Sequence, residues 1–274
     1  MNIVLLDRKT LGNVNLAPLE TLGKLTIYDT TSASELGDRI QNAEIIITNK
    51  VLLNEASLRL AGNLALVCIA ATGTNNVDLS YCHKNNISVK NVTSYSTDSV
   101  VQLTYSFIFY FLQNLQYYKD YSMSGKWQRQ DVFTHFEDFK QLESLQMGII
   151  GLGEIGEKVA SIATAFGASV CYFSTSGKNN KRQYKRVELN DLLESCDIIS
   201  IHAPLNSDTK NLISLKQLNL IKANSILLNL GRGGIICEND LFEFLQEHPE
   251  KIKVGLDVLE DEPISNKHKF LELM

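Results

Sequence analysis

The amino-acid sequence predicts an α/β protein built from two doubly wound domains with parallel sheets. Three observations lead to this fold class. Short apolar runs alternate with helical patterns, the runs are apolar throughout, as in strands covered on both faces, and a glycine turn follows one of them. A polar, turn-rich stretch, TSYSTDSV, interrupts the series. We therefore place the domain boundary there, with one domain over 1–95 and the other over 96–274.

The first domain is expected to contain five strands. Its apolar runs are NIVLLD, KLTIYD, EIIITN, ALVCIAA and ISVKNV, and helical spacing occurs in ASELGDRIQ and NEASLRLAG. After the boundary we expect one long helix over SVVQLTYSFIFYFLQNLQYY, capped by Asp98 or Ser99. This stretch could also be a membrane span, but its short uninterrupted apolar run and its amide side chains favour a buried helix.

The second domain shows a clearer alternation of strands and helices. Strands are expected at LQMGIIG, ASVCYFS, DIISIHA, SILLNLG and IKVGLDV. Helices are expected at EIGEKVASIATAFG, VELNDLLESC, LKQLNLIKA and ENDLFEFLQEH. This βαβαβ pattern indicates a parallel sheet with helices on both faces.

Composition and charge limit the classes of partner and compartment. The chain has 274 residues, is 44% hydrophobic and 21% charged, and carries a formal net charge of -5, so nothing global favours nucleic acid or an anionic membrane. Its five cysteines include no CxxC pair, which indicates reduced thiols rather than a disulfide framework or a zinc site, and we expect no metal. The first residues show no export signal, so we expect a cytoplasmic protein.

The segment GIIGLGEIGEKVA carries the pattern GxGxxG at Gly151, Gly153 and Gly156. The pattern alone is weak, but here it follows a predicted strand and opens a predicted helix. Gly151 permits a tight turn, Gly153 lets the backbone approach a pyrophosphate, and Gly156 lets helix and strand pack closely. Free N–H groups at the helix start favour the anion. A purely structural turn is the alternative.

The end of the following strand bears on the choice of dinucleotide. An acidic residue there normally binds the adenosine ribose, but this sequence has Ser174. Five cations follow it: Lys178, Lys181, Arg182, Lys185 and Arg186. Without the carboxylate, a 2′-phosphate meets less repulsion and nearby cations attract it, although a solvated basic loop explains the same residues. We therefore expect NAD or NADP as cofactor, with a slight preference for accepting NADP.

Five segments together resemble the D-isomer-specific 2-hydroxyacid dehydrogenases, and most closely their glycerate/hydroxypyruvate group. They are ATGTNNVDL, NVTSYSTDSVVQL, GIIGLGEIG, LLNLGRGGIICENDL and GLDVLEDEP. They occur in the family's order and span nearly the whole chain. The resemblance implies a flavodoxin-like substrate domain over 1–95, without its usual C-terminal return segment, and a Rossmann cofactor domain over 96–274.

The resemblance also implies a reaction and its residues. A hydride passes between the nicotinamide and a small 2-oxo or 2-hydroxy acid such as hydroxypyruvate or glyoxylate. Arg232 matches the arginine that binds the substrate carboxylate and carbonyl oxygen, where a planar, permanently charged fork suits the task. Thr72 and Gly73 match the loop whose backbone N–H groups bind the carboxylate. The alternatives are a surface ion pair for Arg232 and a plain turn for the loop.

Further residues match positions that contact the cofactor in the family. Tyr95 and Thr97 match the segment that lines the nicotinamide, and Asp257 matches an aspartate near its carboxamide. Beside the three glycines and Ser174, the remaining expected contacts come from Glu154, Ile155, Pro204, Thr209, Leu230 and Gly231. His202 matches a position beside the cofactor.

Proton transfer is where the sequence departs from the family pattern. Glu262 matches the glutamate that keeps a catalytic histidine charged, with Glu260 and Asp261 as close neighbours. The family's histidine follows in a PH turn after one more strand, and this sequence ends at Met274 before that strand.

The other histidines offer no evident replacement. His83 and His135 lie in other segments, and His248 and His268 are expected on exposed connections. The sequence therefore predicts a dehydrogenase whose activity is impaired by truncation, or a dinucleotide-binding remnant or sensor without turnover. A homodimer through the cofactor domain is also expected.

Overall fold

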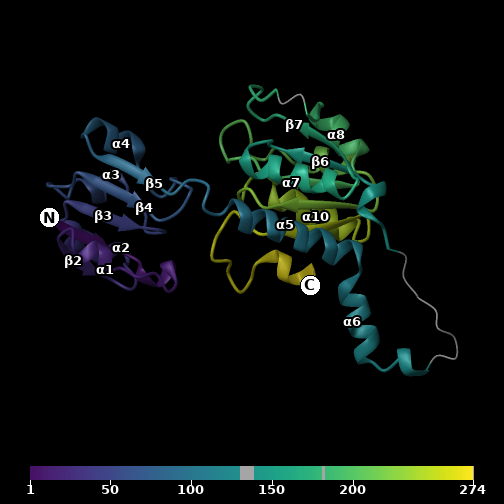
Figure 1. Ribbon diagram of the computed structural model, residues 1–274, viewed down its shortest axis with the longest axis horizontal. Coiled ribbons are helices and arrows are strands. Elements are labelled where there is room, and N and C mark those ends of the chain that lie inside the picture. The colour runs from purple at the N-terminus through teal and green to yellow at the C-terminus, as the bar shows by residue number, and fades with distance from the viewer. Residues whose placement is uncertain (130–138, 181–182, 274) are drawn as a thin grey trace. The chain divides into compact units, whose positions relative to one another are not determined.

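The structure is a computed structural model that describes residues 1–129, 139–180 and 183–273. The chain divides into two compact units, Met1–Ser96 and Thr97–Met274. Each unit is built around its own parallel sheet with helices packed against it, as the alternation of apolar runs and helical patterns predicts (Figure 1). The fold class expected from the sequence is confirmed.

The first unit contains a five-stranded parallel sheet in the order β2-β1-β3-β4-β5. Its strands are β1 (Asn2–Leu5), β2 (Lys24–Ile27), β3 (Ile45–Thr48), β4 (Leu66–Ile69) and β5 (Ser88–Asn91). The connections contain η1 (Arg8–Leu11), α1 (Ala17–Glu20), α2 (Ala33–Ile40), α3 (Glu55–Leu58) and α4 (Leu79–Lys84). This is the flavodoxin-like strand order. Sequence patterning did not anticipate the short helices α1 and α4.

The two faces of this sheet are covered unequally. One face joins Ile46 and neighbouring strand residues to buried side chains of α2, α3 and α4 in a single apolar core. On the opposite face Ile3 and Leu5 of β1 are buried, but Ile45, Ile47, Leu66 and Cys68 remain half-buried, and α1 buries no residue. Strands of parallel sheets are normally covered on both sides. In this sheet the face opposite α2, α3 and α4 buries less apolar surface than the face beneath them.

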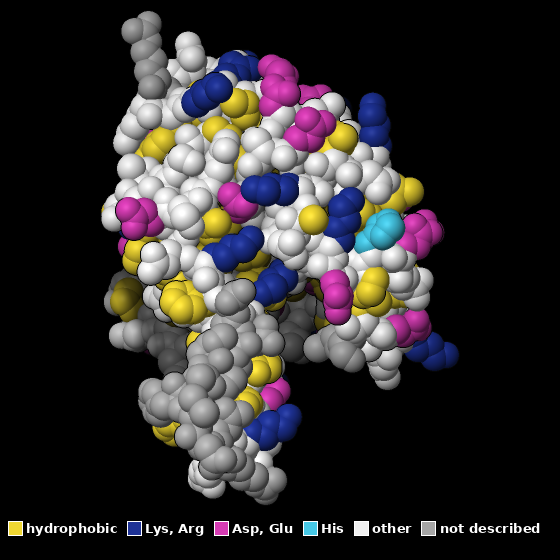
Figure 2. Space-filling view, turned by 90° about the vertical axis from the view of Figure 1, so that its right-hand side faces the viewer, with side chains coloured by type: hydrophobic (Ala, Val, Ile, Leu, Met, Phe, Trp, Pro, Cys, Tyr) yellow, Lys and Arg dark blue, Asp and Glu magenta, His cyan; other side chains and the backbone are white. Residues whose placement is uncertain are grey.

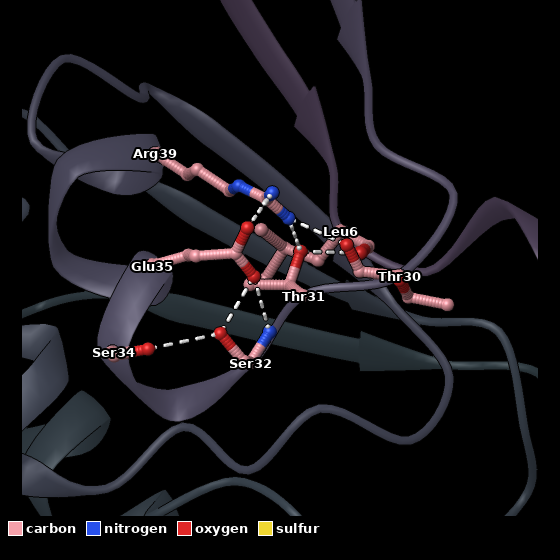
Figure 3. A network of polar contacts seen from close by, with 7 residues as sticks. All are labelled: Leu6, Thr30, Thr31, Ser32, Ser34, Glu35 and Arg39. Atoms are coloured by element: carbon pink, nitrogen blue, oxygen red, sulfur yellow. Dashed lines mark hydrogen bonds and ion pairs between the residues drawn. The ribbon is translucent and has the colours of Figure 1, made fainter.

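A polar network fixes the start of α2 against the end of β1 (Figure 3). The carboxylate of Glu35 accepts the backbone N–H of Ser32 over 2.9 Å and binds Arg39 one turn further along, over 2.6 Å. Arg39 in turn donates to the hydroxyl of Thr31, which itself donates to the carbonyl of Leu6. Hydrogen bonds from Ser32 lower the pKa of Glu35. Helix entry and strand end are thus tied together by one chain of polar contacts.

The second unit contains a six-stranded sheet in the order β11-β10-β9-β6-β7-β8, with all pairs parallel. Its strands are β6 (Gln146–Ile150), β7 (Ser169–Phe173), β8 (Lys185–Arg186), β9 (Ile198–Ile201), β10 (Ser225–Asn229) and β11 (Ile252–Leu256). This is the Rossmann order, with β6 as first strand and its switch point between β6 and β9. The two-residue strand β8 lay outside the sequence expectation.

Helices cover both faces of this sheet. Buried side chains of α5 (Thr97–Leu112) and α7 (Glu154–Ala165) share one apolar core with β6 and β10. The other core includes side chains of α8 (Leu189–Ser195), α9 (Leu215–Leu220) and α10 (Glu238–Glu247). The remaining elements are α6 (Leu115–Met123), η2 (Trp127–Arg129), η3 (Leu142–Ser144) and η4 (Lys269–Leu273).

The long helix expected from Ser99 differs from its prediction in two respects. It begins at Thr97, so Asp98 and Ser99 lie in its first turn and neither is its cap. It is also interrupted at Asn114, whose φ of 46° is left-handed, and continues as the separate helix α6 (Figure 1). Asparagine tolerates left-handed backbone angles better than most residues do. The helix therefore breaks at Asn114 although the helical pattern of the sequence continues beyond it.

The distribution of charge on the surface can be compared with the expectation that nothing in the composition favours nucleic acid or an anionic membrane. On the face drawn in Figure 2, acidic and basic side chains are interspersed and hydrophobic side chains are scattered between them. No helix within the described residues is long and apolar enough to cross a membrane.

Candidate active site

The three glycines of the turn after β6 occupy different environments. Gly151 has a φ of +92°, and a Cβ there would lie 2.8 Å from the backbone nitrogen of Ala203. A Cβ on Gly156 would collide with the carbonyl oxygen of Gly151, which shows how closely α7 approaches the turn. A Cβ on Gly153 would meet nothing within 4 Å. Gly151 and Gly156 are therefore required by packing, whereas the absence of a side chain at Gly153 leaves open space at the start of α7.

The end of β7 lies beside this turn. The backbone N–H of Gly151 donates to the carbonyl of Phe173 over 3.0 Å, so Ser174 directly follows the residue that holds the turn. Ser174 is 6% exposed, and its Oγ is buried with no hydrogen-bond partner among the described residues. A buried hydroxyl without a partner is unfavourable and becomes satisfied when a ligand oxygen reaches it.

The basic residues after β7 are only partly described. Lys178, Lys185 and Arg186 are exposed. Lys181 and Arg182, predicted as part of the same cluster, lie outside the described residues. Asn179, which sequence analysis did not single out, donates from its side chain to the carbonyl of Leu152 and so ties the segment back to the glycine turn.

Thr97 and Glu154, both expected to contact the cofactor, contact each other. The Thr97 hydroxyl donates to the Glu154 carboxylate over 3.0 Å and links the start of α5 to the start of α7. Ile155 is partly buried against the core formed by these helices. Tyr95 is 60% exposed.

Arg232 follows β10 on a loop held by Asn229. The Asn229 amide nitrogen donates to the carbonyl of Arg232 over 2.9 Å, and its amide oxygen accepts the N–H of Gly231 over 3.1 Å. Leu230 and Gly231 are buried, whereas the Arg232 side chain is exposed and donates through Nη1 to the Gly231 carbonyl over 2.8 Å. Asn229 is thus a positioning residue that sequence analysis missed, although its place at the end of a strand was a usable signal.

Ala203 connects the arginine loop to the glycine turn. A Cβ on Gly231 would lie 2.7 Å from the carbonyl oxygen of Ala203, the same residue whose nitrogen Gly151 approaches. A Cβ on Gly233 would collide with the carbonyl of Leu259. The segments that follow β6, β9, β10 and β11 therefore meet without intervening side chains, as expected where the ends of parallel strands form a binding crevice.

The loop after β9 contains the predicted residues Pro204 and Thr209. Thr209 is fully buried, and its hydroxyl donates to the carbonyl of Pro204 over 2.6 Å while accepting the N–H of Asn206 over 2.8 Å. Pro204 is exposed. Thr209 therefore shapes the loop, and Pro204 is the member of the pair that remains available at the surface.

His202 lies at the end of β9 with one ring nitrogen satisfied. Its Nε2 atom lies 2.9 Å from the hydroxyl of Ser200, whereas Nδ1 is buried and has no hydrogen-bond partner among the described residues. Burial lowers the pKa of His202 to about 4. The imidazole is therefore neutral at physiological pH and is not a ready source of a proton.

Two of the predicted acidic residues lie close to each other after β11. The N–H of Asp257 donates to the carbonyl of Asn229 over 3.0 Å, and Glu262 accepts the N–H of Leu259 over 3.0 Å. Partial burial, and then the negative charge of Glu262, raise the pKa of Asp257. Glu260 is engaged differently, since its backbone N–H donates to Glu238 over 2.5 Å.

Among the other histidines, His268 differs from its sequence expectation. The expectation that His268 lies on an exposed connection is wrong: its Nε2 lies 3.4 Å from the buried carboxylate of Glu238, and its side chain is only 13% exposed. Packing of Phe270 against Phe242 of α10 holds this segment on the unit. His83 and His248 are exposed, and His135 lies outside the described residues.

In the first unit, Thr72 and Gly73 follow β4 as predicted. The Asn91 amide donates to the Thr72 carbonyl over 2.7 Å, and Asn76 donates to the carbonyl of Val51 over 3.2 Å. The buried carboxylate of Asp7 binds the loop after β3 and accepts the N–H of Lys50 over 2.6 Å. Sequence analysis missed these three supporting polar residues, because a single sequence does not show which side chains meet.

Three features of the second unit fit the binding of a dinucleotide. Gly153 leaves open space at the start of a twelve-residue helix, the Ser174 hydroxyl is buried and unpartnered, and so is Nδ1 of His202. The first feature accommodates a pyrophosphate, and the other two offer hydrogen-bonding atoms at the ends of β7 and β9, the two strands that flank β6.

Comparisons with known proteins agree with this arrangement. Residues 105–274 match the family model described as D-isomer specific 2-hydroxyacid dehydrogenase, NAD binding domain, and residues 3–184 match the catalytic domain of the same family. The chain is 32% identical to hydroxypyruvate reductase from Blautia hydrogenotrophica, over 99% of this chain and 86% of the relative. It is 30% identical to glycerate dehydrogenase from Methylorubrum extorquens, over 95% of this chain and 82% of the relative.

A solved structure gives the same result for the fold. D-lactate dehydrogenase from Aquifex aeolicus, complexed with NAD and lactic acid, superposes with a TM-score of 0.86 at 26% identity, over 100% of this chain and 85% of that one. The chain therefore belongs to the D-isomer specific 2-hydroxyacid dehydrogenases, oxidoreductases that transfer a hydride between a nicotinamide dinucleotide and a 2-oxo or 2-hydroxy acid.

Proposed function

We propose that this chain reduces a small 2-oxo acid, of the size of hydroxypyruvate or glyoxylate, to the 2-hydroxy acid. The names of its relatives, hydroxypyruvate reductase and glycerate dehydrogenase, support this substrate class. The observation that carries the proposal is the packing of the Arg232 loop and the glycine turn on Ala203. It fixes a guanidinium-bearing loop relative to the loop suited to a pyrophosphate.

Arg232 is assigned to the substrate. Its planar guanidinium binds the carboxylate through parallel hydrogen bonds and stabilises the charge that develops on the carbonyl oxygen. Asn229 contributes by fixing the backbone on both sides of the loop. Backbone N–H groups of Thr72 and Gly73 are assigned to the substrate carboxylate, as the family resemblance implies.

The cofactor supplies the hydride, and the residues assigned to hold it come from the start of α5 and from the segments that follow β6, β7, β9, β10 and β11. The open space at Gly153 is assigned to the pyrophosphate, and the buried, unpartnered hydroxyl of Ser174 is assigned to the adenosine ribose. Asp257, with its raised pKa, is assigned to the nicotinamide carboxamide. The remaining assigned contacts are Thr97, Gly151, Glu154, Ile155, Gly156, Pro204, Thr209, Leu230 and Gly231.

Glu262 is assigned to proton transfer, the role that its match to the family's glutamate implies, and the proton that completes the alcohol is assigned to water. It is exposed, and one of its oxygens accepts the N–H of Leu259, so its position is fixed while its second oxygen can accept another hydrogen bond. The contact of His268 is with Glu238 and does not support a role for His268 with Glu262.

We also infer a homodimer of cytoplasmic chains. An apolar groove between α5 and α7, lined by Val101, Tyr105, Phe109, Ile162 and Phe166, supports pairing through the second unit. The five cysteines are free, which supports a reducing compartment. The oligomer is tested by light scattering on size-exclusion fractions: Phe166→Glu shifts a dimer toward monomer, and a wild-type protein that is monomeric throughout contradicts the inference.

The catalytic proposal is tested with the 274-residue protein and hydroxypyruvate or glyoxylate. We expect loss of reduced-nicotinamide absorbance that depends on the 2-oxo acid, and D-glycerate as the product from hydroxypyruvate by chiral chromatography. Arg232→Gln should lower kcat/KM by about 100-fold or more, because charge-assisted hydrogen bonds in the transition state are lost. Its melting temperature should remain unchanged, because the side chain is exposed.

A cofactor that raises the melting temperature but is oxidised with neither 2-oxo acid contradicts the proposal. That result supports a dinucleotide-binding protein without turnover.

A further inference from the structure

Two cysteine side chains of the second unit are in contact with each other. The Sγ atoms of Cys171, on β7, and Cys196, which directly follows α8, lie 3.5 Å apart. Cys171 is 3% exposed and Cys196 is fully buried. A disulfide holds its sulfur atoms about 2.05 Å apart, so a movement of about 1.5 Å would bring these two to bonding distance. Among the residues that the structure describes, no second pair of cysteine sulfur atoms is in contact.

Gly148 of β6 makes room for this sulfur pair. It pairs with Cys171 across the sheet, and a Cβ on Gly148 would lie 2.9 Å from Sγ of Cys196. Paired residues of neighbouring parallel strands direct their side chains to the same face of the sheet. The two sulfur atoms therefore meet over that face, in space that a side chain at position 148 would occupy.

Two polar side chains separate the sulfur pair from solvent. The Gln146 amide nitrogen lies 3.7 Å from Sγ of Cys171 and 3.5 Å from Oγ of Ser195. That Oγ lies 3.8 Å from Sγ of Cys196. Ser195 is exposed and Gln146 is half-buried. Hydrogen bonds of this length are weak, so a small oxidant reaches the sulfur atoms by displacing one amide side chain.

The two thiols differ in acidity. The hydrogen bond from Cys196 lowers the pKa of Cys171 although burial opposes this shift, and the Gln146 amide and the charge of Lys185 act in the same direction as Cys196. The hydrogen bond with Cys171 raises the pKa of Cys196, and burial raises it further. Because the thiolate is the nucleophilic form, Cys171 is the attacking sulfur and Cys196 is the thiol that retains its proton.

We propose that Cys171 and Cys196 form a reversible oxidation site, at which a small hydroperoxide converts the two thiols to a disulfide. The Cys171 thiolate attacks one peroxide oxygen and the O–O bond breaks, which leaves a sulfenic acid on Cys171 and an alkoxide or hydroxide that takes up a proton from solvent. The Cys196 sulfur then attacks the sulfenic sulfur. An S–S bond forms, and the hydroxyl group leaves as water with the proton of Cys196.

The electrons balance, since the two thiols lose two electrons and the peroxide gains them. The bond closes residues 172–195, which include β8 and α8, into a loop. Such a loop restricts the unfolded chain, so oxidation should raise the melting temperature by about 5–10 °C. The site goes beyond the proposed function and uses neither the dinucleotide nor the 2-oxo acid.

The test treats the full, reduced chain with hydrogen peroxide near neutral pH and follows it by intact mass and peptide mapping. We expect the loss of two hydrogen atoms and a peptide pair joined at Cys171 and Cys196. Alkylation after denaturation should find the other cysteines, Cys68, Cys82 and Cys237, still reduced. Dithiothreitol should restore the original mass and melting temperature.

Single substitutions separate the two roles. Cys196→Ser should stop at a sulfenic acid on Cys171, which dimedone traps, because the second sulfur is missing. Cys171→Ser should form neither the sulfenic acid nor the disulfide. Cys237→Ser is the matched control: it removes a half-buried thiol at the start of α10 and should form the disulfide as the wild type does. Unchanged melting temperatures of the reduced variants verify that they fold.

Absence of the disulfide after peroxide treatment, a disulfide that joins other cysteines or two chains, or trapping of Cys196 in place of Cys171 would overturn the inference. Should a variant fail to fold, the peptide map of the wild type decides the matter. The outcome is independent of turnover. A chain that forms the disulfide but reduces no 2-oxo acid refutes the proposed function alone, and one that reduces hydroxypyruvate but keeps both thiols in peroxide refutes this inference alone.

Discussion

The side chain of Asn229 donates a hydrogen bond to the backbone carbonyl of Arg232 over 2.9 Å. The same amide group accepts the N–H of Gly231 over 3.1 Å, and Asn229 is only 2% exposed. One buried side chain therefore fixes the backbone immediately before and at the arginine. The backbone that carries the exposed Arg232 side chain is therefore held in place by a residue that itself need not touch substrate.

Asn229→Ala should lower both stability and catalytic efficiency. The variant leaves the buried N–H of Gly231 without its partner, a loss of about 1–3 kcal/mol in the free energy of unfolding. Loss of the anchored loop should reduce kcat/KM for hydroxypyruvate by about 10-fold or more, as misplacement of a positioned group does. Urea unfolding and steady-state kinetics measure the two effects. The control is Asn190→Ala, at an exposed position of α8, which should change neither; an Asn229→Ala enzyme with wild-type kcat/KM contradicts the positioning role.

Gly153 and Gly151 should respond in opposite ways to substitution. Gly153→Asp introduces a favourable helix N-cap into open space, so the melting temperature should be maintained or raised. Its carboxylate should nevertheless weaken dinucleotide binding by about 100-fold or more through exclusion and repulsion of the pyrophosphate.

Gly151→Ala, by contrast, forces a φ of +92° on a residue with a Cβ and places that Cβ 2.8 Å from Ala203. It should lower the free energy of unfolding by about 2 kcal/mol or more. Calorimetry and cofactor titration of both variants make the comparison. Tight dinucleotide binding by Gly153→Asp is incompatible with a pyrophosphate at the start of α7.

The unequal cover of the first sheet predicts different costs at adjacent positions. Ile46 is fully buried beneath α2–α4, whereas Ile47 is half-buried on the opposite face. Ile46→Ala should therefore cost about 2–5 kcal/mol of unfolding free energy and Ile47→Ala about 1 kcal/mol. Urea unfolding followed by circular dichroism compares the two. Equal losses would show that both faces are covered to the same degree.

His202 should make stability depend on pH in the mildly acidic range. Its pKa in the folded chain is about 4, below its ordinary value of about 6.5, so the unfolded chain binds more protons between these pH values. Protonation of His202 in the unfolded chain therefore does not affect the free energy of unfolding above pH about 6.5. As the pH falls to about 4, it lowers the free energy of unfolding increasingly, by up to about 3 kcal/mol. His202→Gln should lose less stability than the wild type between neutral pH and pH about 4.5. Parallel curves for the two proteins would contradict the burial of a neutral imidazole.

Much of the fold was predictable because its signals are local. The apolar runs that became β1–β7 and β9–β11 were each bounded by polar or glycine-rich segments, and alternation with helical patterns implied parallel sheets. The strand β8 escaped notice because two charged residues, Lys185 and Arg186, carry no apolar pattern and are held by pairing with β7 alone. The break at Asn114 was missed because helical periodicity continues on both sides of it.

The candidate site was predictable only in part for a related reason. Gly151, Gly153 and Gly156 follow from a short motif with a physical mechanism, and the motif's context was correctly inferred. Asn229 and Asn179 were not found, since their roles depend on contacts that spacing does not reveal. His268 was misplaced because a polar segment, NKHKF, suggests exposure, whereas Phe270 packs on α10 and Glu238 offers a buried partner.

Isotopic labelling shows whether this chain transfers a hydride from the nicotinamide to a 2-oxo acid. The full chain is incubated with hydroxypyruvate and a reduced nicotinamide dinucleotide deuterated at the transferable position, and the product is analysed by mass spectrometry. We expect D-glycerate with deuterium bonded to its second carbon, and we expect the rate at which it forms to fall by about 100-fold or more in Arg232→Gln. Unlabelled glycerate, or labelled product formed equally fast by Arg232→Gln, would contradict this expectation.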